Sequence, residues 1–527
     1  MGTLILTAKH HDGFCLWPSL LTDHSIERSP WKAGLGDVLG ELSQSCQQAG
    51  IRLGVYLSPW DRNAPLYGTP SYNQFYLGQL EELLTRYGPI AEVWMDGAKG
   101  ANAPAMAYDF EAYWALIRRL QPGAVLFSDA GPDVRWIGNE HGKAPSTCWS
   151  TIDRSKITIG NGSATQRQYL GSGDPNGQDW VAAECDVSIR PGWFYHASED
   201  SRVKSPRELV SLYYECVGRN ATLLLNLPPD RRGLIHENDV AALREFRSIL
   251  DESFRANLAL GARATASNVR SAHPQFDPAK TTDADTTSYW ATDDGLGQAS
   301  VTLELAQEQS FDRIMIQEPI WLGQRIEHFA VEAEQLGQWR QLTDGSTVGY
   351  KRLARVPATR ARRVRFSFRT ARSALAISNL GLFKASPRET GDPSGSLAFG
   401  KPATASNVTG PPNVYTADKA FDDNPDTRWA TDDGLAPWWL EVDLEVNPAA
   451  PALIGRVMID EPLPFHRIQQ FELQAFDGQT WRTFHTGTTV GSKHQIHVQP
   501  VTAWRVRLHV LRSTRGPTIA ELQLFAR

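Results

Sequence analysis

Residues 1–255 alternate short apolar runs with segments of helical periodicity, the pattern of βα units joined into a parallel sheet. Strands are predicted at residues 4–9, 51–57, 90–95, 124–128, 180–183 and 221–225. Helices are predicted at residues 36–48, 74–87, 105–120, 206–217 and 237–250. The favoured architecture is a (β/α)8 TIM-like barrel, which needs about eight strands over about 250 residues. An open doubly wound sheet is the alternative, but no Gly-x-Gly-x-x-Gly turn marks a nucleotide crevice.

From about residue 256 the chain changes to short alternating apolar and polar runs with frequent turn residues, typical of an all-β region. This region repeats itself: Thr265-Ala-Ser-Asn268 returns as Thr404-Ala-Ser-Asn407, Trp290-Ala-Thr-Asp-Asp-Gly-Leu296 as Trp429-Ala-Thr-Asp-Asp-Gly-Leu435, and Met315-Ile-Gln-Glu-Pro319 as Met458-Ile-Asp-Glu-Pro462. Two copies at domain-sized spacing predict tandem β-sandwich modules. We therefore expect a barrel at 1–255, sandwiches at 256–388 and 397–527, and a linker at 389–396.

Composition excludes some classes of protein. A net charge of −6 over 527 residues, without a Lys/Arg-rich run, argues against nucleic-acid binding. No apolar run approaches the ~18 residues that a membrane span needs. The five cysteines form no Cys-x-x-Cys pair and are odd in number, so we expect buried thiols and no disulfide framework. The 17 tryptophans suit a protein that packs indoles on sugar rings, although tryptophan is also a core residue.

The amino terminus reads as a barrel strand with no leader before it. Its first ten residues have no basic n-region and no cleavage site, so they are not a signal peptide. We expect the chain to be part of a longer protein that carries one or two further barrel units. The full-length protein is expected to be periplasmic or secreted.

Ionisable and aromatic residues recur where the predicted strands end. His10, His11 and Asp12 follow the first strand, Tyr56 ends the second, Trp94 and Asp96 end the third, Glu140 lies in a loop predicted at 135–142, and Glu184 follows a later strand. Because parallel barrel strands present their carboxyl ends on one face, we expect these side chains to meet there.

Two carboxylates from different loops, Asp96 and Glu140, are the minimal set for glycoside hydrolysis. An acid on a rigid strand end suits the nucleophile, because attack needs tight positioning. An acid on a mobile loop suits the proton donor. Two other interpretations stay open: Asp96 caps the following helix, or His10, His11 and Asp12 bind a catalytic metal. The metal is disfavoured because adjacent strand residues point to opposite faces.

These motifs resemble the family-29 glycoside hydrolases, the retaining α-L-fucosidases, over residues 3–250. The resemblance rests on Leu6-Thr-Ala-Lys-His-His-Asp-Gly-Phe14, Gly54-Val-Tyr-Leu-Ser58, Val93-Trp-Met-Asp-Gly97 and Gly218-Arg-Asn-Ala-Thr-Leu-Leu-Leu-Asn226. It implies that Asp96 is the nucleophile and Glu140 the acid/base, with Glu184 as the competing acid. It further implies that His10, His11 and Tyr56 hydrogen-bond fucose hydroxyls, that Trp94 and Trp193 line the pocket, and that catalysis needs no cofactor.

The segments around Glu140 and residues 188–196 resemble the subgroup that prefers α-1,3/1,4-linked fucose. The expected partners are fucosylated oligosaccharides and glycoconjugates. Family members carry an earlier strand that ends in a further sugar-binding histidine, and this chain starts after it. The alternative function is therefore a carbohydrate-binding protein with impaired catalysis.

The two repeats resemble discoidin-like or family-32-type carbohydrate-binding β-sandwiches. Asp283 with Asp285, and Asp422 with Asn424, resemble the loop that holds a structural calcium in many such modules. Oxygen ligands at alternating positions suit that cation. A turn rich in Asp and Asn without a metal is the equal alternative.

Overall fold

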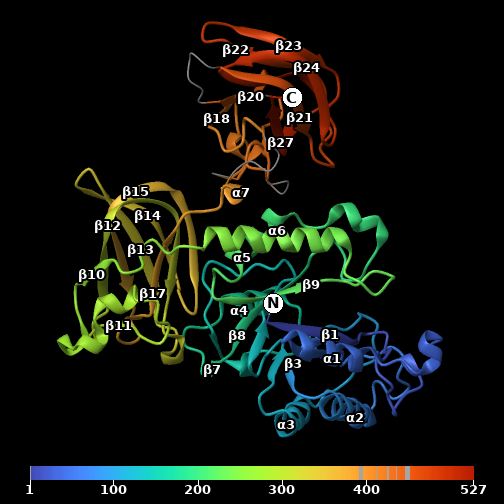
Figure 1. The fold of residues 1–527 in the computed structure, drawn as a ribbon. Helices are drawn as coiled ribbons and strands as arrows, with labels where there is room; N and C mark the ends of the chain where they lie inside the picture. The colour runs from blue at the N-terminus through green and yellow to red at the C-terminus, as the bar shows by residue number, and fades with distance from the viewer. Residues whose placement is uncertain are drawn as a thin grey trace. The chain divides into compact units, whose positions relative to one another are not determined.

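The computed structural model describes residues 2–390, 396–411, 414–423, 427–434, 436–444 and 451–526. The chain forms two compact units, Met1–Ala385 and Ser386–Arg527. The first unit contains a parallel α/β domain and a β-sandwich, and the second contains another β-sandwich (Figure 1). The predicted fold class is confirmed as a parallel half-barrel followed by antiparallel sandwiches. Among the described residues, no helix has the length and apolarity to cross a bilayer.

Seven parallel strands form the sheet of the α/β domain, in the order β1-β2-β3-β4-β5-β8-β9. Their bounds are β1 Thr3–Lys9, β2 Arg52–Leu57, β3 Ile90–Trp94, β4 Val125–Ser128, β5 Val134–Trp136, β8 Ala182–Ser188 and β9 Ala221–Asn226. Within the described residues, β1 pairs only with β2 and β9 only with β8, so the sheet is an open half-barrel.

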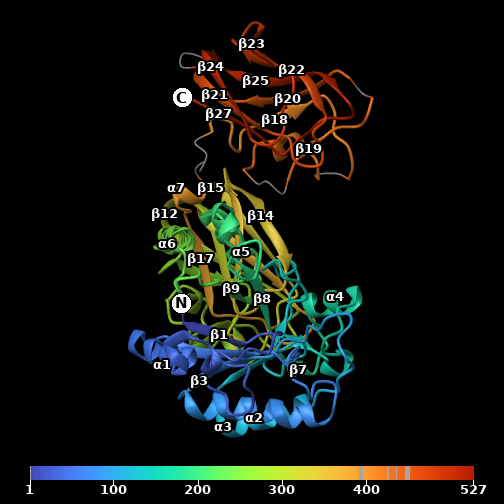
Figure 2. The ribbon, with the colours of Figure 1, turned by 90° about the vertical axis from the view of Figure 1, so that its right-hand side faces the viewer.

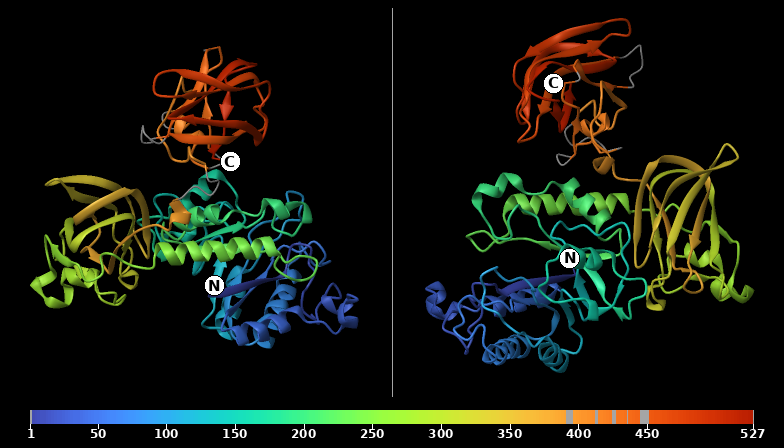
Figure 3. Two further views of the ribbon diagram at one scale, coloured as in Figure 1. Left: turned by 45° about the horizontal axis from the view of Figure 1, so that its top comes forward. Right: turned by 180° about the vertical axis from the view of Figure 1, so that it is seen from behind.

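Helices cover the convex side of this sheet (Figures 1 and 2). They are α1 Val38–Ala49, α2 Ser71–Arg86, α3 Phe110–Leu120, α4 Ala164–Ser172, α5 Pro206–Glu215 and α6 Glu237–Ser253. Helix α2 packs beside α3, and α5 beside α6 (Figure 3). The start of α5 is encoded locally: Ser205 Oγ accepts from the Glu208 N–H, and the Glu208 carboxylate accepts from the Ser205 N–H.

Strand β5 differs from the sequence prediction, which places a loop at 135–142 because the residues around Arg135 are polar. The Arg135 side chain is fully buried. Its guanidinium donates to the carbonyls of Leu170, Val181 and Trp149. These hydrogen bonds offset the cost of burying a charge, so Arg135 can occupy a strand inside the sheet. The predicted strand at 180–183 is in fact two elements, β7 Asp179–Trp180 and β8, and β7 pairs with β6 Thr151–Ile152 outside the main sheet.

The first sandwich packs around apolar residues that alternate along its long strands. Its main sheet has β10 Arg263–Ala266, β12 Gln298–Gln317, β13 His328–Gln335, β14 Gln338–Ser346, β15 Arg352–Arg369 and β17 Asn379–Phe383, and β11 Trp290–Ala291 pairs with β16 Ala376–Ile377. This sandwich docks on the α/β domain through hydrogen bonds described below, which explains why both lie in one compact unit.

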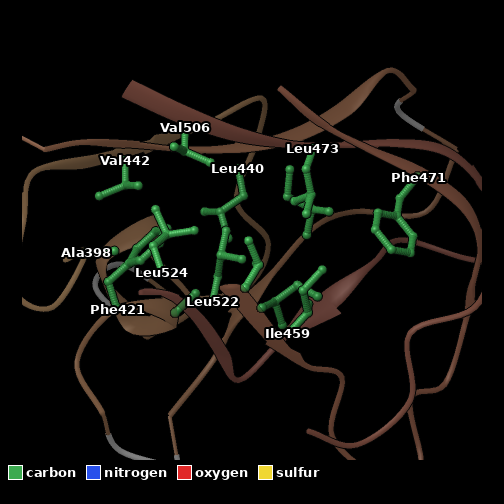
Figure 4. Packing of buried hydrophobic residues seen from close by; sticks show 14 of the residues in the cluster. Ala398, Phe421, Leu440, Val442, Ile459, Phe471, Leu473, Val506, Leu522 and Leu524 are labelled. Carbon is green, nitrogen blue, oxygen red and sulfur yellow. The ribbon is translucent and has the colours of Figure 1, made fainter. Parts of the chain in front are cut away.

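The second unit begins with α7 Pro387–Thr390 and repeats this architecture. Its strands are β18 Ala403–Ala405, β19 Trp429–Ala430, β20 Trp438–Asp443, β21 Ala452–Asp460, β22 Ile468–Phe476, β23 Trp481–Gly487, β24 His494–Ala503, β25 Arg505–Ser513, β26 Thr518–Ile519 and β27 Glu521–Phe525. Apolar side chains from its five-stranded sheet β18-β20-β25-β22-β23 and its three-stranded sheet β24-β21-β27 meet in one core (Figure 4).

The repeated motifs occupy matching places in the two sandwiches. Trp290 and Trp429 are fully buried, and each indole N–H donates to the carbonyl of the repeated asparagine, Asn268 at 2.9 Å and Asn407 at 3.1 Å. The repeated glutamates, Glu318 and Glu461, each accept three main-chain N–H groups from the loops that follow. The repeat therefore conserves buried polar anchors as well as apolar positions.

Candidate active site

Asp96 lies directly after β3, at the carboxyl edge of the sheet. Its Oδ2 accepts a hydrogen bond from the Tyr56 hydroxyl at 2.8 Å, and its Oδ1 accepts from the Ala98 N–H at 2.7 Å. The next helix, α3, begins only at Phe110 and is capped by Asp109. The interpretation of Asp96 as a helix cap is therefore wrong. Two donors from different elements fix this carboxylate, and part of it remains open to solvent.

His10 and His11 lie together above this carboxylate. Their ring centroids are 4.0 Å apart, and His10 stacks on Tyr56 at 5.7 Å. The argument that adjacent residues must point apart is wrong here, because β1 ends at Lys9 and the histidines follow the strand. Within the described part of the chain, however, no three His, Cys, Asp or Glu side chains gather as a metal site.

The hydrogen bonds of His11 fix its tautomer. Ser58 donates its one hydroxyl proton to the Trp60 carbonyl at 2.7 Å. His11 Nδ1, 2.7 Å from the Ser58 oxygen, must therefore carry the proton in this bond. Burial lowers the pKa of His11 despite the charge of Asp96, so the ring is neutral near pH 7. Its Nε2, 3.6 Å from Asp96 Oδ2, is therefore the unprotonated nitrogen and can accept a hydrogen bond.

Stacked aromatic rings support the floor of the site. Tyr56 stacks on Trp94 at 5.2 Å between centroids, and Trp94 stacks on Phe127 at 3.9 Å. The Trp94 indole donates to Glu184 Oε1 at 2.9 Å. Burial, reinforced by the neighbouring Glu92, raises the pKa of Glu184, whose side chain is 3% exposed. Glu184 thus holds an aromatic ring from behind and does not face the opening.

Glu140 is exposed, on the loop that leaves β5. Its charge reaches Asp186, an acid that sequence reasoning did not single out. Asp186 lies two residues before the end of β8, accepts from the Trp136 indole at 2.9 Å and is 7% exposed. Burial, with the charges of Glu140 and Glu184, raises the pKa of Asp186 to about 8. Two acids of different exposure therefore lie near each other at this edge.

A second unpredicted acid, Asp129, lies against the residue that follows Asp96. A methyl group on Gly97 would lie 2.4 Å from Asp129 Oδ2, so only glycine permits this approach. The Gly160 N–H donates to the same oxygen at 2.7 Å. Burial and the charge of Asp96 raise the pKa of Asp129 to about 6, although the hydrogen bond from Gly160 lowers it. The signal that could have revealed it is Asp129 itself, one residue beyond a strand end.

The loop after β8 brings aromatic residues over the histidines. Phe194 meets His10 edge to face at 5.0 Å, whereas Trp193, the residue singled out in the sequence, is 38% exposed. The loop is held by Arg190, whose buried guanidinium contacts Asp239 at 3.0 Å and Asp200 at 2.8 Å. Trp193 therefore lies at the rim, one residue from the ring that touches the site.

The acidic loops of the sandwiches use their carboxylates internally. Asp283 accepts from the Asp285 N–H at 2.9 Å, and Asp285 accepts from the Thr287 N–H at 2.8 Å. Asp422 accepts from the Thr427 hydroxyl at 2.8 Å, and Asn424 lies outside the described residues. These hydrogen bonds stabilise turns within the loops, and calcium binding there stays a prediction.

Comparison with known proteins agrees with this arrangement. The Alpha-L-fucosidase family profile matches residues 3–252, the F5/8 type C domain profile residues 263–379, and the NedA-like, galactose-binding domain profile residues 419–508. Alpha-L-fucosidase 1 of Arabidopsis thaliana is 48% identical over 385 residues, which cover 72% of this chain and 75% of that protein.

Solved structures give the same result. A Ruminococcus gnavus family-29 fucosidase in complex with fucose is 36% identical, with a TM-score of 0.68 over 73% of this chain and 82% of that one. A glycoside hydrolase 29 family member from an unknown rumen bacterium is 30% identical, with a TM-score of 0.65 over 100% of this chain and 89% of that one. The chain therefore belongs to the α-L-fucosidase family of glycoside hydrolases, family 29, and its sequence continues after the α/β domain with F5/8 type C and galactose-binding domains.

Proposed function

We propose that this protein is a retaining exo-α-L-fucosidase that releases α-1,3/1,4-linked fucose from glycans by double displacement. The observation that carries the proposal is the Asp96 carboxylate, fixed by Tyr56 and by the Ala98 amide yet open to solvent beneath His10 and His11. A carboxylate held by two donors is preorganised for attack. The linkage preference rests on the likeness of the Glu140 loop to that subgroup.

In the first step Asp96 forms a bond to the anomeric carbon while Glu140 gives its proton to the departing glycosidic oxygen. In the second step Glu140 takes a proton from water, whose oxygen attacks the same carbon and releases Asp96. Configuration is inverted twice and so retained. Tyr56 donates to Asp96 throughout, which limits rotation of the attacking carboxylate.

We assign the donor role to Glu140 rather than to Glu184. Glu184 is buried and bonded to the Trp94 indole, so it would have to break that bond to reach a leaving group. Glu140 is exposed and needs no such rearrangement.

The histidines suit recognition of a hydroxylated ring. The Nε2 lone pair of His11 accepts a hydrogen bond from a sugar hydroxyl, since Nδ1 already donates to Ser58. Its neutral state avoids placing a cation beside the nucleophile. His10 and Tyr56 add aromatic faces against which the apolar side of a deoxysugar can pack.

The test is Asp96→Ala, assayed on an activated aryl α-L-fucoside with and without azide. We expect hydrolysis to fall by at least about 10⁴-fold, and azide to restore turnover as the β-fucosyl azide, because a small anion fills the space left by the carboxylate. Asp12→Ala, which removes an acid near the same histidines, is the matched control. Full activity of Asp96→Ala would refute the assignment.

The second candidate is a carbohydrate-binding protein with impaired catalysis. It is favoured by the open sheet, in which β1 and β9 each have one partner among the described residues. Calorimetric binding of fucose without any hydrolysis of activated or natural fucosides would support it.

A further inference from the structure

The loop that carries Glu140 is short and fixed at both ends. The Ile137 N–H donates to the Glu184 carbonyl at 3.0 Å, and the Ala144 N–H donates to the Glu215 carbonyl at 2.9 Å. Only residues 138–143 lie between these two bonds. These two hydrogen bonds argue against the expected mobile loop. The contacts that hold the chain after residue 143 therefore limit the positions that Glu140 can reach.

The first sandwich supplies part of that fixation through one amide. Gln324 Oε1 accepts from the Ser150 N–H at 2.8 Å, and Gln324 Nε2 donates to the Cys148 carbonyl at 3.0 Å. The side chain is 9% exposed. Gln324 thus satisfies one donor and one acceptor of the main chain that follows the loop, as a neighbouring strand would.

Two arginines hold the same segment a few residues earlier. Arg352 of β15 donates to the Ser146 carbonyl at 2.7 Å, and Arg219 donates to the Ala144 carbonyl at 2.7 Å. Arg219 and Arg352 face each other in an antiparallel bridge between the two domains. Of these two anchors at the loop exit, Arg352 comes from the first sandwich, and Arg219 pairs with it across the bridge.

The backbone at this contact is strained. Thr347 has φ of 48°, a conformation that β-branched residues rarely adopt, and it is buried. In this conformation its hydroxyl oxygen lies 3.2 Å from the Cys148 nitrogen and accepts the N–H. Strain of this kind persists where the surroundings demand it, so the contact with the loop is specific.

We propose that Gln324 and Arg352 of the first sandwich are positioning residues for the acid/base, acting through the main chain of residues 144–150. This rests on the proposed role of Glu140. The sandwich touches no substrate in this scheme. It sets the place from which Glu140 delivers a proton, so the second half of the first unit is part of the proton-transfer machinery.

The test compares kcat/KM on two fucosides, one with a poor leaving group (a disaccharide) and one with an activated aryl leaving group. The first needs the proton from Glu140 and the second does not. The variants are Gln324→Met, which keeps the length of the side chain and removes the hydrogen bonds to Ser150, Cys148 and Asn220, and Arg352→Ala. Glu140→Ala is the reference. Arg355→Ala is the matched control, because this arginine of β15 lies over the Tyr214 ring of α5 instead.

We expect Gln324→Met and Arg352→Ala to lose about 10- to 100-fold on the disaccharide, as small misplacements of a catalytic group do, and less than about 3-fold on the aryl fucoside. Arg355→Ala should show no such split. Equal losses on both substrates, or no loss, would overturn the inference. If Gln324→Met does not fold, Gln324→Glu, which keeps the acceptor for Ser150, gives the same comparison.

The Glu140→Ala reference distinguishes a wrong acid/base from a wrong positioning role. If Glu140→Ala shows no split between the substrates, the proposed acid/base is wrong and the inference falls with it. If Glu140→Ala shows the split and the sandwich variants do not, the inference alone is wrong.

Discussion

The buried acid Asp186 offers a quantitative test of how the two carboxyl groups at this edge divide their roles. The perturbation is Asp186→Asn, which replaces the carboxyl by its neutral isostere and keeps an oxygen to accept from the Trp136 indole. A carboxyl whose pKa is raised by burial binds its proton more tightly in the folded state than in the unfolded state. The stability of the wild-type protein should therefore fall as pH rises from about 4 towards 8.

The magnitude follows from that pKa. Between an unfolded pKa of 3.8 and a folded pKa of about 8, each pH unit costs about 1.4 kcal/mol relative to a group that does not titrate. From pH 5 to pH 7 the sum is about 2.6 kcal/mol, by the same linkage. Asp186→Asn removes this slope, so its stability advantage over wild type should grow by that amount across the interval.

The assay is calorimetry of both proteins at pH 5, 6 and 7, following the transition of the first unit. The difference in Tm should widen steadily with pH. At pH 7 the variant should keep kcat/KM on the disaccharide within about 3-fold, since the donor is assigned to Glu140. Parallel stability curves would refute the buried neutral carboxyl, and a loss near 100-fold would move the donor role to Asp186.

Three further outcomes are expected. Tyr56→Phe removes a hydrogen bond to a charged group worth about 1.5–3 kcal/mol, so kcat/KM should fall about 10- to 150-fold while Tm changes little, and an unchanged kcat/KM would contradict the role of the 2.8 Å bond to Asp96. Gly97→Ala forces Asp129 away from a contact of 2.4 Å, and steady-state assays should show a lower kcat with substrate binding less affected; wild-type kcat would argue against this close approach. Arg190→Met leaves fully buried Asp239 without its ion pair and should destabilise the first unit by about 3–5 kcal/mol. Calorimetry measures this change, and an unchanged Tm would show that the ion pair does not stabilise the unit.

The sequence predicts the elements whose signal is local. The apolar runs at β3 and β9, and the helix predicted at 206–217, appear where the pattern places them. Strand β5 could not be predicted, because its stability depends on three distant carbonyls that receive the Arg135 guanidinium. Short helix α4 was missed for a similar reason, since its residues are mostly polar.

The site residues also differ in whether a local sequence signal predicts them. Asp96 and Tyr56 were identified from strand ends and lie in contact. The direction of His10 and His11 depends on where β1 ends, which periodicity resolves only to within a few residues. The contact of Phe194 with His10 and that of Asp129 with Gly97 join segments far apart in sequence, so no local pattern encodes them.

Glu318 and Glu461 bind equivalent main-chain amides in the two sandwiches, so the residues around them can be compared position by position. Aligned on the amides that Glu318 and Glu461 bind, His466 takes the place of Gln324 and His494 that of Arg352. The later copy thus offers imidazoles where the earlier one offers an amide and a guanidinium. Gln324→His and Arg352→His would therefore remove the side-chain hydrogen bonds to Ser150, Cys148 and Ser146 without changing an apolar residue of the first sandwich core.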